Sequence, residues 1–241
     1  MPRHSRRDPI FRYRRHEDEI IVLAVRWYSS YRLSLRDLTE MLDDRGINVR
    51  SSTIWRWVQH YVPEFEKRWN RLRRRTGTSW RVDDTYVQIR GKWFYLYRAV
   101  DKKGLTIDFL LRPDRGVGAA PAFFRKAVVS NHGRGPRKVT LDDHAPSRRA
   151  LWLLRRDALF WRHVQVRTKR YLNNIVEQDH RAIKRRCSAM RGFKSVPATI
   201  VAIAGMEPAH RIRKRQFRFG RARGRRRHSL KSAWNRALFG T

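Results

Sequence analysis

The spacing of apolar residues changes near Trp80, and this change constrains the fold more than any other feature. Before Trp80, apolar residues recur at intervals of three and four positions, the period of a helix that buries one face. From Trp80 to Leu111 they form short runs rich in Val, Ile, Tyr, Trp and Phe, which favour strands. The 241 residues suffice for one substantial core and a small accessory domain. We therefore expect a small helical domain followed by a larger domain built on a sheet.

Residues 17–62 predict three short helices. Ser34 stands three residues before Asp37, the spacing of a capping box, so the second helix is expected to start at Ser34. Gly46 supplies the tight turn that ends it. The first helix has one apolar stripe, which consists of Ile20, Leu23, Ala24 and Trp27. The third starts after Ser52 and has a buried stripe, which consists of Ile54, Trp57, Val58 and Tyr61.

The opposite face of the third helix carries side chains that can donate and accept hydrogen bonds. These are Thr53, Arg56, Gln59 and His60. Two helices joined by a glycine-bearing turn, with a supporting helix before them, are typical of a helix-turn-helix, whose second helix reads base edges in the major groove of DNA. A small three-helix bundle with no DNA role is the alternative, and the charge of the chain favours DNA binding.

Residues 80–207 predict a mixed α/β domain. Turns at Arg90-Gly91 and Lys103-Gly104 divide its first part into three strands of an antiparallel meander. In the middle strand, the alternating aromatic residues Trp93, Tyr95 and Tyr97 are interpreted as sheet core in preference to a stacking platform. The later elements are a helix at about 118–130, a strand at 138–141, a helix at about 147–158, a strand near 163–166 and a helix from 174 to about 190. This order resembles a ribonuclease-H-like fold, a mixed sheet with helices on its faces, although other α/β sheets share such alternation.

Three segments lie outside these two domains. Residues 1–16 form a basic arm, which either follows DNA or is a solvated terminus. Residues 63–79 are expected to be a linker, because Pro63 closes the preceding helix. Residues 208–241 form a basic C-terminal segment without an acidic residue, which fits either binding to the DNA backbone or a disordered extension.

The charge of the chain indicates a polyanionic partner. The formal net charge is +36, and nucleic acid is the usual partner of such an excess. An anionic membrane is the competing partner, but no amphipathic or lipid-modified segment accompanies the charge. The first ten residues lack the apolar core of a signal peptide, and the longest largely apolar run, 196–206, is too short to span a bilayer. We therefore expect a cytoplasmic protein with no membrane partner.

Three acidic residues stand at positions where strands and helices bring ligands together. Asp83 lies within the first strand, Asp143 follows the fourth, and Glu177 lies in the first turns of the long helix. Carboxylate oxygens suit Mg²⁺, and two such ions activate the attacking oxygen and stabilise the leaving oxygen in phosphodiester cleavage. Each acid taken alone is as readily a turn or edge residue, so spacing leaves the choice open.

Long segments of the chain resemble the insertion-sequence-6 family of bacterial DDE transposases. WRVDDTYVQIRGKWFYLYRAVDKKGLTIDF is similar to the family's first catalytic block. RYLNNIVEQDHRAIKRR, followed by GFKS, is similar to its third. The resemblance runs from about residue 17 to about 220, and it implies that Asp83, Asp143 and Glu177 are the catalytic acids and metal ligands.

The resemblance also implies a reaction. A transposase of this kind uses two Mg²⁺ or Mn²⁺ ions to cleave DNA at the terminal inverted repeats of an insertion sequence and to join the ends to target DNA, by a replicative route. Two ends must be held together, so a homo-oligomer is expected. On the long helix, Arg181 and Lys184 share a face with Glu177 and are candidates to hold target phosphates, although they could equally be solvated charges.

Departures from the family pattern leave a rival interpretation. The family has Glu beside the first acid, where this chain has Asp84, and the residues flanking Asp143 are largely replaced, so that Asp142 competes with it. Pro208 also interrupts an expected helix. A non-catalytic DNA-binding protein, or a decayed transposase copy, is the alternative.

Overall fold

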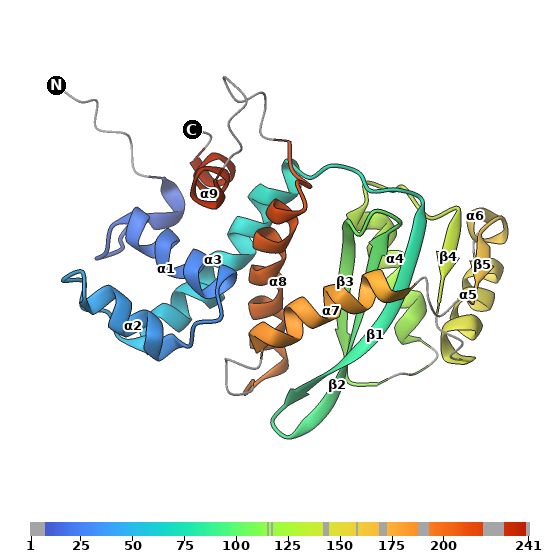
Figure 1. The fold of residues 1–241 in the computed structure, drawn as a ribbon, viewed down its shortest axis with the longest axis horizontal. Helices are drawn as coiled ribbons and strands as arrows, with labels where there is room; N and C mark the ends of the chain where they lie inside the picture. Colours follow the sequence, from blue (N-terminus) through green and yellow to red (C-terminus); the bar gives the residue numbers. More distant parts are fainter. Residues whose placement is uncertain are drawn as a thin grey trace. The chain divides into compact units, whose positions relative to one another are not determined.

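The computed structural model describes residues 8–114, 116, 118–141, 145–157, 159–168, 173–187, 193–218 and 229–239. The chain divides into two compact units, one from Met1–Arg73 with Pro197–Thr241 and the other from Arg74–Val196. The first is helical and the second contains the sheet (Figure 1). None of the helices in these described ranges is long and apolar enough to cross a membrane.

The helical unit begins with the three predicted helices, α1 (Asp18–Ser30), α2 (Leu35–Asp43) and α3 (Ser51–Arg71). The capping box of α2 is confirmed: the Asp37 amide donates to Ser34 Oγ over 3.1 Å, and the Ser34 amide donates to an Asp37 carboxylate oxygen over 2.7 Å. Gly46 follows α2 with a φ of 71°, a left-handed conformation that glycine adopts without strain.

The buried face of α1 differs from the prediction. Its buried apolar residues are Ile21, Val22, Ala24, Val25 and Tyr28, whereas Ile20, Leu23 and Trp27 are only partly buried. Residues 20–25 are all apolar, so two adjacent stripes both satisfy helical spacing. Packing against α3 selects between them, and the sequence does not.

Helix α3 continues through Pro63 to Arg71, so the predicted linker at 63–79 is wrong over its first nine residues. A proline inside a helix removes one hydrogen-bond donor and strains the preceding turn. Here the buried stripe predicted from Ile54 to Tyr61 is confirmed and is extended by Val62, Phe65 and Trp69. Burial of these large side chains outweighs the lost hydrogen bond.

Two further helices, α8 (Val196–Arg213) and α9 (Leu230–Phe239), complete the helical unit. Pro208 is inside α8, and nearly the whole helix belongs to this unit, so the predicted domain boundary at 207/208 does not fit the structure. The Trp234 ring of α9 is buried against Trp69 of α3, with ring centroids 5.5 Å apart. Residues 230–239 are therefore part of a packed core and not a disordered extension.

The described part of the basic arm also packs. Phe11 is fully buried, and its ring stacks on Tyr61 of α3 with a centroid distance of 5.0 Å. Asp8 forms an ion pair with Arg68 over 2.6 Å, and this contact holds the pKa of Asp8 below its usual value. Residues 8–11 therefore belong to the helical unit, while residues 1–7 of the predicted arm lie outside the described residues.

The second unit contains one five-stranded sheet in the order β3-β2-β1-β4-β5. The first three strands form the predicted antiparallel meander, and β1, β4 and β5 run parallel. The strands are β1 (Ser79–Ile89), β2 (Lys92–Asp101), β3 (Thr106–Arg112), β4 (Lys138–Thr140) and β5 (Gln165–Arg167). The helices are α4 (Ala119–Ser130), α5 (Ala145–Asp157), α6 (Leu159–Arg162) and α7 (Asn174–Cys187).

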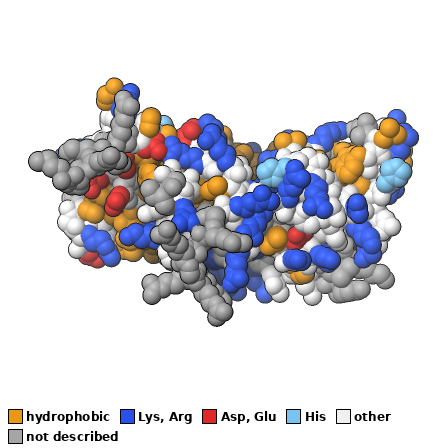
Figure 2. All heavy atoms as spheres, turned by 90° about the horizontal axis from the view of Figure 1, so that it is seen from above, with side chains coloured by type: hydrophobic (Ala, Val, Ile, Leu, Met, Phe, Trp, Pro, Cys, Tyr) orange, Lys and Arg blue, Asp and Glu red, His pale blue; other side chains and the backbone are white. Residues whose placement is uncertain are grey.

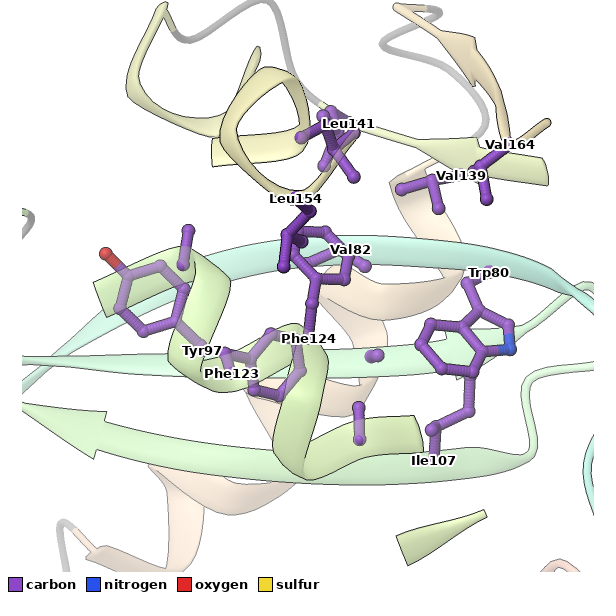
Figure 3. Packing of buried hydrophobic residues seen from close by; sticks show 14 of the residues in the cluster. Trp80, Val82, Tyr97, Ile107, Phe123, Phe124, Val139, Leu141, Leu154 and Val164 are labelled. Carbon is purple, nitrogen blue, oxygen red and sulfur yellow. The ribbon is translucent and has the colours of Figure 1, made fainter. Parts of the chain in front are cut away.

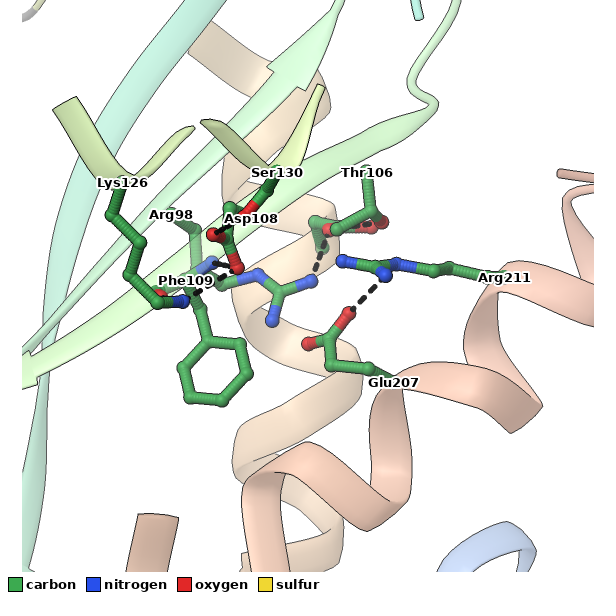
Figure 4. Close-up of polar contacts among 9 residues, drawn as sticks. Arg98, Thr106, Asp108, Phe109, Lys126, Ser130, Glu207 and Arg211 are labelled. Carbon is green, nitrogen blue, oxygen red and sulfur yellow. Dashed lines mark hydrogen bonds and ion pairs between the residues drawn. The ribbon is translucent and has the colours of Figure 1, made fainter. Parts of the chain in front are cut away.

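One face of this sheet packs on α4, α5 and α6. Trp80 and Val82 of β1 and Tyr97 of β2 meet Phe123 and Phe124 of α4 there (Figure 3). At the edge of this face, Lys126 of α4 donates to Asp108 of β3 over 2.8 Å, and Ser130 donates to the same carboxylate (Figure 4). Helix α7 contacts β1 and β2 on the other face. The mixed sheet with helices on both faces confirms the ribonuclease-H-like prediction.

Candidate active site

Strand geometry decides which of the two adjacent acids in β1 faces α7. Side chains alternate along a strand, and Val82 points into the core with α4. Asp83 therefore points to the opposite face, where its cross-strand partner is Arg98 of β2. Asp84 pairs with Tyr97, whose ring stacks on Phe123 of α4. Of the two carboxylates, Asp83 is the one on the α7 face.

A buried ion pair fixes α7 to the sheet. Arg98 donates to Asp179 of α7 over 2.6 Å, and the two side chains are 0% and 4% exposed. The Thr106 hydroxyl of β3 donates to the same Asp179 oxygen over 3.3 Å. Burial of two charges is costly unless they are paired and hydrogen-bonded, as they are here. Sequence analysis missed this pair, since an Arg within a strand and an Asp on a distant helix carry no shared motif.

His180 brings α7 against Asp83. Its Nε2 lies 3.6 Å from an Asp83 carboxylate oxygen, and its side chain is 5% exposed. Burial, followed by the nearby positive charge of Arg98, lowers the pKa of His180 to about 3. The imidazole is therefore neutral near neutral pH and is no proton carrier there. It fills the space beside Asp83 without neutralising its charge.

Glu177 lies one helical turn before His180 on α7 and is exposed. Residues three apart on a helix are neighbours on its surface, with Cβ atoms roughly 5–6 Å apart. Since the His180 ring touches Asp83, Glu177 and Asp83 lie on the same side of the sheet. Two of the three predicted acids thus lie on the same side of the sheet.

The third predicted acid, Asp143, lies outside the described residues, as do Asp142 and His144. The strand that precedes it is described: Thr140, the last residue of β4, pairs with Arg81, two residues before Asp83. Within the described ranges, no three His, Cys, Asp or Glu side chains group as a metal site would require. The Asp83 and Glu177 carboxylates are nevertheless hard oxygen donors of the kind that Mg²⁺ and Mn²⁺ accept.

Basic residues follow Glu177 along the same face of α7. Arg181 and Lys184 are four and seven residues after it, and both are exposed. Lys184 lines a hollow of about 580 Å³ together with Tyr86, Trp93 and Tyr95. On the face that Figure 2 shows, Lys and Arg side chains are spread widely and fewer acidic ones are visible.

The predicted DNA-reading face of α3 is only partly exposed. Arg56 and His60, one turn apart, are exposed, whereas Thr53 and Gln59 are partly buried. The Nε2 atom of His60 accepts a hydrogen bond from Arg14 over 3.4 Å, and the ring packs its edge on Tyr61. The amide nitrogen of Gln59 is buried. Arg56 is thus the side chain of this group best placed to reach DNA.

Comparisons with known proteins agree with this geometry. A family model described as a DDE domain matches residues 77–216. The chain is 39% identical to the transposase for insertion sequence-like element IS431mec of Staphylococcus aureus. The match spans 193 residues, which are 80% of this chain and 85% of the relative. The same figures hold for the transposase of insertion sequence element IS257 in transposon Tn4003, from the same species.

Among solved structures, the catalytic core domain of HTLV-2 integrase matches 54% of this chain and 84% of its own, with 15% identity and a TM-score of 0.42. That likeness is weak, and the fold assignment rests on the strand order given above. The match to the family model and the identity to two curated transposases carry the conclusion: this chain belongs to the insertion-sequence-6 family of DDE transposases.

Proposed function

We propose that this chain cleaves DNA at the ends of an insertion sequence and joins them to target DNA, with Asp83, Asp143 and Glu177 as the catalytic acids. One observation supports the site above all others: His180, one helical turn after Glu177 on α7, contacts Asp83 on β1. The carboxylate oxygens of these three acids are ligands that would suit two Mg²⁺ or Mn²⁺ ions. Such ions, when bound, would activate the attacking oxygen and stabilise the leaving one.

The residues of the proposed site have separate roles. Asp83 and Glu177 would hold the metal ions, and the buried pair of Arg98 and Asp179 joins α7 to β2, the strand that pairs with β1. Neutral His180 shields one side of Asp83 from water and leaves its negative charge intact. Exposed Arg181 and Lys184 would bind phosphates of the strand being processed.

The reaction proposed has two transfers at phosphorus. Water attacks at the end of the element and frees a 3′-hydroxyl, which then attacks a phosphodiester of the target and displaces the 3′-oxygen of the adjoining nucleotide. The exposed end of the α3 face, with Arg56, would recognise the terminal inverted repeats. Because both ends must be held together, the active form would be a homo-oligomer, and replication across the joined strands would give a cointegrate.

Strand transfer in vitro tests this proposal. A duplex carrying one element end with its flanking DNA is incubated with supercoiled plasmid, and joined products are separated by electrophoresis. Products are expected with Mg²⁺ or Mn²⁺, with few or none in Ca²⁺, whose coordination is larger and looser. Undiminished joining in excess chelator would exclude metal-dependent transfer. Binding to the end without joining, under every metal condition, would favour the rival non-catalytic DNA-binding protein.

A further inference from the structure

Among the described residues, three aromatic rings from the β1–β2 hairpin and one lysine line the hollow beside α7. Tyr86 of β1 and Trp93 and Tyr95 of β2 form its aromatic wall, and Lys184 of α7 adds a cation. The Tyr86 ring lies 6.1 Å from Trp93 and 5.3 Å from Tyr95, centroid to centroid. The three rings therefore form one continuous cluster.

Two of the three rings lie largely outside the sheet core, whereas Tyr95 is partly buried and packs against it. Tyr86 is 43% exposed and Trp93 is 59% exposed, so the interpretation of Trp93 as core is wrong. The core ends near Tyr97, where α4 covers the sheet, and the hairpin extends beyond it. Packing on α4, α5 and α6 thus does not account for the exposed parts of the Tyr86 and Trp93 rings, whereas a ligand with a flat apolar face would.

The chemistry of the hollow fits an unpaired nucleobase. Base stacking on an aromatic side chain is worth a substantial binding gain per base and tolerates any sequence, and a nearby lysine binds the attached phosphate. A base within a duplex is stacked on its neighbours and offers no free face to such rings. A protein ligand is less favoured, because a chain with a net charge of +36 selects for an anionic partner.

The position of Lys184 relates the hollow to the candidate active site. Lys184 follows Glu177 by seven residues of continuous helix, a rise of about 10 Å. A DNA strand covers that distance in roughly three nucleotides at 3.4 Å each. A strand with its scissile phosphate at Glu177 would therefore have a base within reach of the aromatic rings a few nucleotides away.

We propose that Trp93, Tyr86 and Tyr95 stack on one unpaired base of the DNA strand being processed, while Lys184 binds its phosphate. The location close to the cleavage position rests on the proposed function. The captured base keeps the end of the duplex open and fixes the strand relative to Asp83 and Glu177. Stacking itself needs no metal and no reaction, so it is measured separately.

Binding of oligothymidylate without divalent metal is the first test. Trp93→Ala is compared with Trp93→Phe and with Trp152→Ala, a matched control in which the tryptophan is also exposed and lies beside a cation, Arg156, but does not line the hollow. Trp93→Ala is expected to weaken binding roughly tenfold, whereas Trp93→Phe and Trp152→Ala bind as the parent does. An abasic oligomer of equal length should bind all four proteins alike. Equal loss on both oligomers, or no loss on either, would overturn the proposal.

Photocrosslinking locates the base directly. A single-stranded oligomer with 5-iodouracil at one position is irradiated with the full-length chain, and the linked peptide is identified by mass spectrometry. Links to Trp93, Tyr86 or Tyr95 are expected, and they should disappear on competition with oligothymidylate but not with the abasic oligomer. Links confined to other parts of the chain would contradict the stacking site.

The two proposals fail in different ways. If the parent protein stacks the base but never joins DNA under any metal condition, the transposition reaction is wrong and the stacking site stands. If it joins DNA and Trp93→Ala binds oligothymidylate unchanged, the stacking site is wrong and the reaction stands. When both stand, a further expectation links them: element ends with unpaired bases a few nucleotides from the cleavage position rescue joining by Trp93→Ala at least in part.

Discussion

Arg98 of β2 and Asp179 of α7 form a buried ion pair of 2.6 Å, although six strands and helices of the described chain lie between β2 and α7. Asp179 is two residues after Glu177, and Arg98 is the cross-strand partner of Asp83. The pair therefore joins α7 to the strand beside the one that carries Asp83. In the proposed site it would help to position both acids without contributing a metal ligand.

Removing one partner of this pair should destabilise the chain strongly. Asp179→Ala leaves the guanidinium of Arg98 buried without its counter-ion, and we expect the free energy of unfolding to fall by about 3–5 kcal/mol. Urea denaturation followed by circular dichroism measures it. The matched control is Asp114→Ala, which removes a mostly exposed pair with Arg112 and should cost less than about 1 kcal/mol. The double variant Arg98→Met with Asp179→Leu should recover much of the loss, and a double variant as unstable as Asp179→Ala would contradict this reasoning.

Cys187 should be unreactive in the folded chain. Burial raises the pKa of its thiol from 9.0 to about 11, although Arg186 partly opposes the shift. The thiol is thus protonated at pH 8, and alkylation by iodoacetamide should be slow in buffer and fast in denaturant. Since the folded pKa exceeds the unfolded one, the stability contributed by Cys187 is present below pH 9 and is lost as the pH rises towards 11. Equal alkylation rates with and without denaturant would show that the thiol is accessible.

Arg56 should contribute sequence recognition as well as charge. It is exposed on α3, next to the buried stripe of that helix. Arg56→Ala should weaken binding to the element's own end by about 1–3 kcal/mol and bind scrambled duplex nearly as well as the parent does. Competition binding at several salt concentrations measures both affinities. Arg71→Ala, an exposed arginine at the end of the same helix, serves as the control and should lower both affinities alike. An equal loss on both duplexes for Arg56→Ala would mean that α3 contacts only the DNA backbone.

Much of the fold is predictable from local pattern, because strands, turns and caps depend on neighbouring residues. The meander follows from alternation in residues 80–111, and the start of α2 follows from Ser34 and Asp37. The placement of Asp83 follows from the same alternation once the core face of β1 is known. These features require no knowledge of distant contacts.

The predictions that were wrong depend on contacts between segments that are distant in the sequence. Which apolar stripe of α1 is buried depends on its packing against α3, so the sequence of α1 alone does not decide it. Pro63 and Pro208 lie inside helices in which burial of the side chains outweighs the lost hydrogen bond. The pairing of Arg98 with Asp179 joins residues 81 positions apart, which no local pattern encodes. Trp93 looks like a core residue because its strand is aromatic throughout, and only the limited reach of α4 leaves it exposed.

The most direct test of the catalytic assignment is strand transfer by variants that exchange each carboxylate for its amide. Asp83→Asn, Asp143→Asn and Glu177→Gln are compared with Asp84→Asn and Asp142→Asn, the adjacent acids, and binding to the element end is measured for each in parallel. We expect the first three to lose joining by a factor of about a thousand or more while binding stays within about twofold, since each would remove a charged metal ligand. The two controls should join DNA nearly as the parent does. Full joining by Asp83→Asn or Glu177→Gln would contradict the account, and loss in Asp142→Asn with activity kept in Asp143→Asn would assign the second acid to Asp142.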